Sequence, residues 1–138
     1  MGDTNAAVIE RYREAFQSGD LSQLASTLTE VASDDFVEEW PQSGERIVGR
    51  EMFLKINQSY EGATGSSPKM TLRRISGSGD LYVLEGTIDY GDGTPVSYVG
   101  ITEFRDGKVV KVTEYFANPF EAPAWRAGMV ERMEPATV

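Results

Sequence analysis

The sequence predicts an α+β fold, a cone-shaped α+β roll in which three N-terminal helices pack on a curved antiparallel sheet. Apolar residues recur at helical spacing up to Tyr60, and from Lys69 onward they alternate with a period of two. Three Gly-containing turn signals, at 77–79, 91–93 and 106–107, divide the second part into consecutive strands. Such strands form an antiparallel meander with one apolar face, and the helices are expected to cover it.

The N-terminal part contains three helical patterns and one short strand. A first helix ends at Gly19, and a second follows directly. Residues 36–40 are typical of a strand, followed by a loop at 42–45. A third helix starts after Gly49 and is expected to end in the Gly- and Ser-rich run 61–68.

The C-terminal part contains the sheet and a tail. Strands are expected near 69–76, 80–90, 95–105 and 108–117. The tail, 118–138, is rich in Pro but carries Phe120 and Trp125, so we interpret it as an arm or lid. With no linker or repeat, residues 1–138 are expected to form a single domain.

Composition restricts the partners and the chemistry. The 138 residues include 13 Lys and Arg against 22 Asp and Glu, a net charge of −9 that disfavours nucleic acid and anionic membranes. No signal-peptide pattern opens the chain, so we expect a cytoplasmic location. Without Cys or His, the chain lacks a thiolate nucleophile, a Ser-His-Asp relay and His or Cys metal sites, and we predict no metal and no cofactor. Acid–base chemistry must therefore use Asp, Glu, Tyr or Lys.

The last strand contains the strongest candidate for such chemistry. Alternation places Glu114 on one face with Val110, Val112 and Phe116, opposite Val109. A carboxylate among apolar side chains is costly to desolvate, so its pKa should rise and make it a candidate acid or base. Tyr12, on the apolar stripe of the first helix, is a candidate donor to a ligand oxygen. The structural alternative is a packed Tyr12 whose hydroxyl bonds a buried Glu114.

A second carboxylate is expected from the first strand. Phe36, Glu38 and Trp40 share one strand face, so Glu38 accompanies the aromatic side chains inward if the strand is regular. A bulge before Pro41 would expose Glu39 instead. We name Glu38 first and Glu39 second as candidate catalytic residues.

The remaining candidate ligand-binding residues are inward-facing and mostly apolar. They are Trp40, Phe53, Ile56, Leu84, Ile88, Thr102, Phe104, Val112 and Phe116.

Three segments together resemble the nuclear transport factor 2-like superfamily. They are IERYREAFQSGDLSQLASTL, DDFVEEWPQSGERIVGREMF and ITEFRDGKVVKVTEYFANPF, and the similarity is greatest to the SnoaL-like group. This superfamily includes ketosteroid isomerases, polyketide cyclases, epoxide hydrolases and pocket proteins without a known reaction. The resemblance implies the cone-shaped fold and a pocket, and it places Val112, Glu114 and Phe116 on the pocket face. Function on this fold varies with the pocket.

Ketosteroid isomerases use a helix-one Tyr, an Asp base on the first strand and a protonated Asp on a later strand. The resemblance places the Tyr at Tyr12. The base falls at Glu39 when counted from Val37, and at Trp40 when counted back from Pro41. The protonated acid falls at Thr102, which is not a carboxylic acid, so steroid isomerisation is disfavoured.

Two interpretations of function remain. The first is a pocket that binds a small, largely apolar organic molecule, with or without acid–base catalysis of the isomerase, cyclase or hydrolase type that uses Glu and Tyr. The second is a non-catalytic assembly module with a filled core. In either case we expect a homodimer through the outer sheet face, as is common in the superfamily. Its residues would be Val83, Thr87, Ser97, Val99, Ile101, Thr113 and Tyr115.

Overall fold

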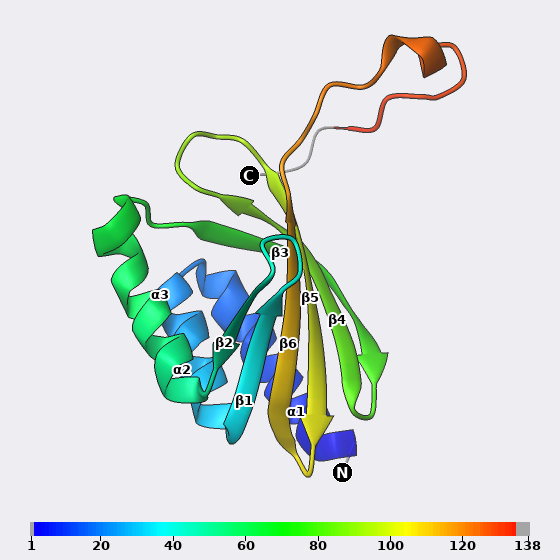
Figure 1. Cartoon of the computed structure of the whole chain (residues 1–138). Coiled ribbons are helices and arrows are strands. Elements are labelled where there is room, and N and C mark those ends of the chain that lie inside the picture. Colours follow the sequence, from blue (N-terminus) through cyan, green and yellow to red (C-terminus); the bar gives the residue numbers. More distant parts are fainter. Residues whose placement is uncertain (1, 135–138) are drawn as a thin grey trace.

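Three helices lie against one face of a six-stranded curved sheet in the computed structural model, which describes residues 2–134 (Figure 1). The helices are α1 (Gly2–Ser18), α2 (Leu21–Val31) and α3 (Arg50–Thr64). The strands are β1 (Ala32–Trp40), β2 (Glu45–Val48), β3 (Lys69–Ser78), β4 (Leu81–Asp89), β5 (Val96–Arg105) and β6 (Lys108–Ala117). The α+β class predicted from the sequence is confirmed.

Local chemistry explains where the helices begin and end. Gly19, with φ of 69°, separates α1 from α2, and the Asp20 side chain caps α2 by accepting from the Ser22 N–H at 2.9 Å. Helix α3 continues into the Gly- and Ser-rich run and ends at Gly65, which has φ of 72°. The Gly65 N–H donates to the Glu61 carbonyl at 2.7 Å, so the left-handed residue terminates the helix.

The sheet is mixed rather than wholly antiparallel. Its order is β2-β1-β6-β5-β4-β3, and the meander β3 to β6 is antiparallel as predicted. Strand β1 instead joins β6 in parallel. Helix α3 and four strands separate β1 from β6 along the chain, so no tight turn dictates their relative direction. The prediction of an all-antiparallel sheet was wrong at this one pairing.

The sequence analysis also missed strand β2. Trp40 and Glu45 close a hairpin between β1 and β2, where the predicted loop lies. Gly44, with φ of 75°, donates its N–H to the Trp40 carbonyl at 2.9 Å. Only Ile47 of the four β2 residues is buried, as in a short edge strand, so no alternation was visible.

A register irregularity in β6 reverses the faces that were predicted for Val109 and Val110. Glu103 pairs with Lys111 but Phe104 pairs with Val109, so Val110 is an extra residue opposite this step. Val109 is therefore fully buried, and Val110 lies beside an outer groove. Simple alternation predicted the reverse, because it did not include a bulge.

The hydrophobic core lies between the helices and the sheet, and it continues from the residues around the cavity to the end of the fold where α1 begins. Asn5, 1% exposed, donates to the Gly79 carbonyl at 2.8 Å and to Asp80 Oδ1 at 3.0 Å. These bonds tie α1 to the β3–β4 turn. Phe104 packs on Tyr82 in the same region, with ring centroids 5.9 Å apart. This end is thus closed by packed side chains.

The C-terminal segment leaves the end of β6 and projects away from the helices and the sheet (Figure 1). It contains one turn of 3-10 helix, Ala124–Arg126, and its large apolar side chains are exposed, Phe120 at 82% and Trp125 at 74%. Residues 135–138 of the predicted arm lie outside the described residues. Within residues 2–134, no helix has the length and apolarity required to cross a membrane.

Candidate functional site

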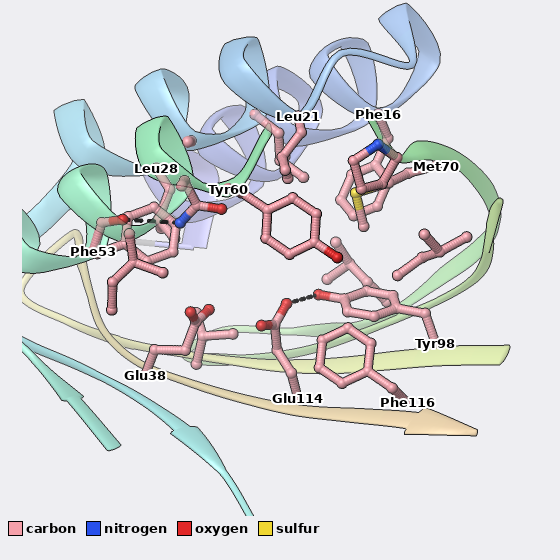
Figure 2. A pocket seen from close by; sticks show the side chains of 18 of the residues that line it. Phe16, Leu21, Leu28, Glu38, Phe53, Tyr60, Met70, Tyr98, Glu114 and Phe116 are labelled. Carbon is pink, nitrogen blue, oxygen red and sulfur yellow. Dashed lines mark hydrogen bonds between the residues drawn. The ribbon is translucent and has the colours of Figure 1, made fainter. Parts of the chain in front are cut away.

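A cavity of about 140 Å³ lies between the helices and the inner face of the sheet. Its lining is mainly aromatic and aliphatic, with two carboxyl groups on the sheet side (Figure 2). The residues come from all three helices and from five strands. They are Tyr12, Phe16, Leu21, Leu24, Ala25, Leu28, Glu38, Trp40, Phe53, Ile56, Asn57, Tyr60, Pro68, Met70, Leu84, Ile88, Tyr90, Tyr98, Thr102, Val112, Glu114 and Phe116.

The parallel pairing of β1 with β6 brings the two carboxyl groups together. Glu38 is paired with Val112, so Glu114 is the next residue of β6 that faces the same side. Trp40 donates its indole N–H to Glu114 Oε1 at 2.9 Å. Tyr98, on β5, donates its hydroxyl to Glu114 Oε2 (Figure 2). Each oxygen of Glu114 therefore receives one donor.

Glu38 is the neutral member of this pair. The residue is 3% exposed, and burial, followed by the charge of Glu114 and a hydrogen bond with it, raises the pKa of Glu38 far above its ordinary value of 4.5. Two carboxylates in one apolar cavity disfavour each other's ionisation. Because the donors Trp40 and Tyr98 both reach Glu114, the negative charge is stabilised there and the proton stays on Glu38.

Tyr12 faces the same pair from α1 and has no hydrogen-bond partner. Tyr12 is 4% exposed, and within residues 2–134 no donor or acceptor forms a hydrogen bond with its buried hydroxyl. Burial, and then the charges of Glu38 and Glu114, raise the pKa of Tyr12 well above its ordinary value. A buried hydroxyl without a partner is costly, so it marks a position where a ligand atom can bind.

Gly100 provides the space that Tyr98 needs to reach Glu114. Gly100 and Glu114 are directly paired across β5 and β6, and Tyr98 lies two residues along on the same face. A Cβ at position 100 would lie 2.5 Å from the Tyr98 hydroxyl oxygen. The Tyr98 ring thus lies over the glycine, and its orientation depends on the absence of a side chain there.

Most of the residues predicted for the site line the cavity. These are Tyr12, Glu38, Glu114, Trp40, Phe53, Ile56, Leu84, Ile88, Thr102, Val112 and Phe116. Their predicted roles in catalysis and binding stay predictions.

Two predicted site residues lie elsewhere. Glu39 faces the outer side of β1, where Arg46 bonds its carboxylate and the Lys111 ammonium lies 2.9 Å from it. These contacts lower the pKa of Glu39, and β1 pairs regularly with β2 from Val37 to Trp40, so no bulge next to Pro41 turns this side chain inward. Phe104 belongs to the closed end of the core, where it packs on Tyr82.

Polar lining residues that were not predicted from the sequence include Tyr98, Tyr60, Tyr90 and Asn57. Tyr98 lies between Ser97 and Val99, which were predicted to face the outer side of the sheet. Strand alternation therefore already indicated that Tyr98 faces the cavity. The helical stripe through Phe53 and Ile56 likewise includes Asn57 and Tyr60.

No metal centre is recognisable among the described residues, in which no three acidic side chains are grouped to hold an ion. None of the described residues lining the cavity is Lys or Arg. The site therefore offers acid–base and hydrogen-bonding groups in apolar surroundings.

We predict that Glu38→Gln makes the protein more stable relative to wild type as pH rises. Because the pKa of Glu38 is raised in the folded protein, protonated Glu38 contributes fully to the stability of wild type below about pH 4.5. This contribution is lost as the pH rises toward the pKa of Glu38 in the folded protein. One such group lowers the free energy of unfolding by up to about 1.4 kcal/mol per pH unit in that window. Urea unfolding between about pH 5 and pH 8 measures the difference.

Between about pH 5 and pH 8 the effect of Glu38 is not mixed with that of three other carboxyl groups. The pKa values of Asp35, Glu39 and Glu85 are lowered, so these groups change the stability only at lower pH. Glu39→Gln is the matched control and should leave the pH slope above about pH 5 unchanged. Parallel curves for wild type and Glu38→Gln would contradict a neutral buried Glu38.

We predict that Gly100→Ala destabilises the protein by about 1–3 kcal/mol through its clash with Tyr98. In a Tyr98→Phe background the nearest clashing atom is gone, so the same change should cost about 1 kcal/mol less. Urea unfolding of the four proteins in this cycle gives the coupling between the two positions. Equal costs in both backgrounds would show that Tyr98 does not lie over Gly100.

Comparison with known proteins agrees with this fold. Residues 9–112 match the family model of the SnoaL-like domain. A nuclear transport factor 2-like protein of unknown function from Burkholderia xenovorans is 35% identical, with a TM-score of 0.74 over 96% of this chain and 97% of that one. A candidate ketosteroid isomerase from Kribbella flavida is 25% identical, with a TM-score of 0.78 over 97% and 93% of the two chains.

A candidate SnoaL-like polyketide cyclase from Jannaschia, 17% identical over 84% of this chain and 87% of that one with a TM-score of 0.66, shares the fold. A search of the curated proteins found no match. The match to the family model covers most of the sequence, so this chain belongs to the SnoaL-like domain family.

Proposed function

We propose that the protein binds a small, largely apolar organic molecule with an oxygen function and transfers a proton on it by acid–base chemistry. The observation that carries this proposal is the buried, unpartnered hydroxyl of Tyr12 beside the carboxyl groups of Glu38 and Glu114. A carbonyl oxygen placed at Tyr12 would satisfy this donor and meet the acid–base pair at the same time.

The three groups suit proton transfer next to a carbonyl. Glu114 accepts a proton from carbon, the electron pair moves onto the carbonyl oxygen, and Tyr12 donates a hydrogen bond to the developing negative charge. Glu38 already carries a proton and donates it to complete an isomerisation or cyclisation, and the proton taken up by Glu114 then returns to Glu38 through the hydrogen bond between the two carboxyl groups. No cofactor is required for these steps.

The cavity size supports a small substrate. A cavity of about 150 Å³ in another protein takes one benzene ring, and the cavity here is about 140 Å³. The relative from Kribbella flavida is described as a candidate ketosteroid isomerase, but four fused rings exceed this volume. We therefore propose a one-ring or comparably small acyclic substrate.

Exchange of hydrogen for deuterium next to the carbonyl of cyclohexanone tests the proposal without knowledge of the natural substrate. In D₂O, wild type should accelerate the loss of these proton signals in the NMR spectrum. Glu114→Gln should reduce the enzymatic rate by about 10²-fold or more, and Tyr12→Phe by about 10²-fold.

Glu39→Gln is the matched control, because its carboxylate lies on the outer face of the same strand. It should exchange at the wild-type rate. Equal rates for wild type and Glu114→Gln, or no acceleration by wild type, would overturn the proposed reaction.

A second candidate function is assembly through the outer face of the sheet. The register pairs Val99 with Tyr115 and Val83 with Ile101, and Tyr115 is 41% exposed. These side chains form an apolar stripe on the face that the helices leave uncovered, and we propose that a second copy covers it in a homodimer. The cytoplasmic location stays a prediction.

Light scattering at micromolar concentration tests the dimer. Wild type should have twice the mass of one chain, and Tyr115→Glu should convert it to a monomer by placing a charge in the interface. Gln17→Glu, which adds the same charge on exposed α1, should stay dimeric. A monomeric wild type would rule out this assembly.

A further inference from the structure

The negative charge inside the cavity has no counter-charge. Glu114 has hydrogen-bond donors from Trp40 and Tyr98, and both donors are neutral. Within residues 2–134, no ion pair reaches Glu38 or Glu114, and two cations of the strands on either side of β1, Arg46 of β2 and Lys111 of β6, are engaged with Glu39 on the outer face. A carboxylate in apolar surroundings without a cation is costly, and a ligand that carries a positive charge would reduce that cost.

Aromatic side chains surround this charge. Eight aromatic residues line the cavity, and Figure 2 shows the rings of Tyr60, Tyr98 and Phe116 around Glu114. The faces of such rings attract organic cations, and the attraction is greater in a desolvated site. Their apolar area also favours the hydrocarbon part of a ligand.

The unpartnered hydroxyl of Tyr12 provides a third contact. A tyrosine hydroxyl can accept as well as donate a hydrogen bond, and an ammonium group has only donors. Glu38, Glu114 and Tyr12 therefore present acceptors from three elements toward one region of the cavity. An anion placed there would meet two carboxyl groups and no cationic residue.

We infer that the cavity binds a small monocyclic amine in its protonated form. The ammonium group lies at Glu38, Glu114 and Tyr12, and the ring lies among the aromatic side chains. The volume of about 140 Å³ limits the ligand to one ring with a short substituent. This inference uses the same cavity as the proposed function but does not depend on the proton-transfer reaction.

Three probes with the same ring and different charges test the inference. Benzylamine is a cation at neutral pH, benzyl alcohol is neutral and benzoate is an anion, and isothermal titration calorimetry measures their affinities. Benzylamine should bind wild type at least about tenfold more tightly than benzyl alcohol, as expected for a charge-assisted hydrogen bond. Benzoate should not bind.

Variants at the carboxyl pair locate the cation. Glu114→Gln should weaken benzylamine about tenfold or more and change benzyl alcohol less than about threefold. If this variant does not fold by circular dichroism, Glu114→Asp serves in its place and should also weaken benzylamine, because the shorter side chain withdraws the carboxylate from the ammonium group. Glu39→Gln is the control and should bind all three probes as wild type does.

Benzylamine that fails to bind, or that binds no more tightly than benzyl alcohol, overturns the inference. So does an affinity for benzylamine that is unchanged in the tested carboxyl variant. The proposed reaction can survive these results if deuterium exchange in cyclohexanone still depends on Glu114. Conversely, tight benzylamine binding without exchange would reject the reaction and leave the amine site intact.

Discussion

The proton shared by Glu38 and Glu114 is the constraint on which the rest of the site depends. Two ionised carboxylates in an apolar cavity without a cation would repel each other at high cost. Burial keeps the proton on Glu38, while the indole of Trp40 and the hydroxyl of Tyr98 stabilise the charge of Glu114. Tyr12 adds a donor with no partner of its own. The result is two carboxyl groups and an unpartnered hydroxyl within one apolar space.

The fold brings these groups together from strands that are distant in the sequence. Parallel pairing of β1 with β6 places Glu38 beside Glu114, and antiparallel pairing of β6 with β5 adds Tyr98. Gly100 lies opposite Glu114 and leaves the space that the Tyr98 ring occupies. The mixed sheet is therefore what assembles the acid pair, whereas the helices close the cavity over it.

Alternation in regular strands was sufficient to predict that Glu38 and Glu114 face inward, and the change of period was sufficient to predict the α+β class. It failed at Val110, where an extra residue in β6 reverses the parity, and a bulge leaves no mark in composition. The parallel pairing and the role of Gly100 depend on long-range register, which one sequence does not display. For Phe104, an inward direction was correct, but the cavity ends before it because Tyr82 fills the space.

Carbon-13 NMR of the glutamate carboxyl carbons measures whether Glu38 is protonated, because each carboxyl carbon reports its own ionisation state. With Glu38→Gln used to assign the signal, we expect Glu38 to have the chemical shift of a neutral acid from about pH 5 to pH 7, whereas Glu39 and Glu85, whose pKa values are lowered, should have the shift of a carboxylate over the same range. A Glu38 signal that titrates near its ordinary value of 4.5 would show two carboxylates in the cavity and contradict the account.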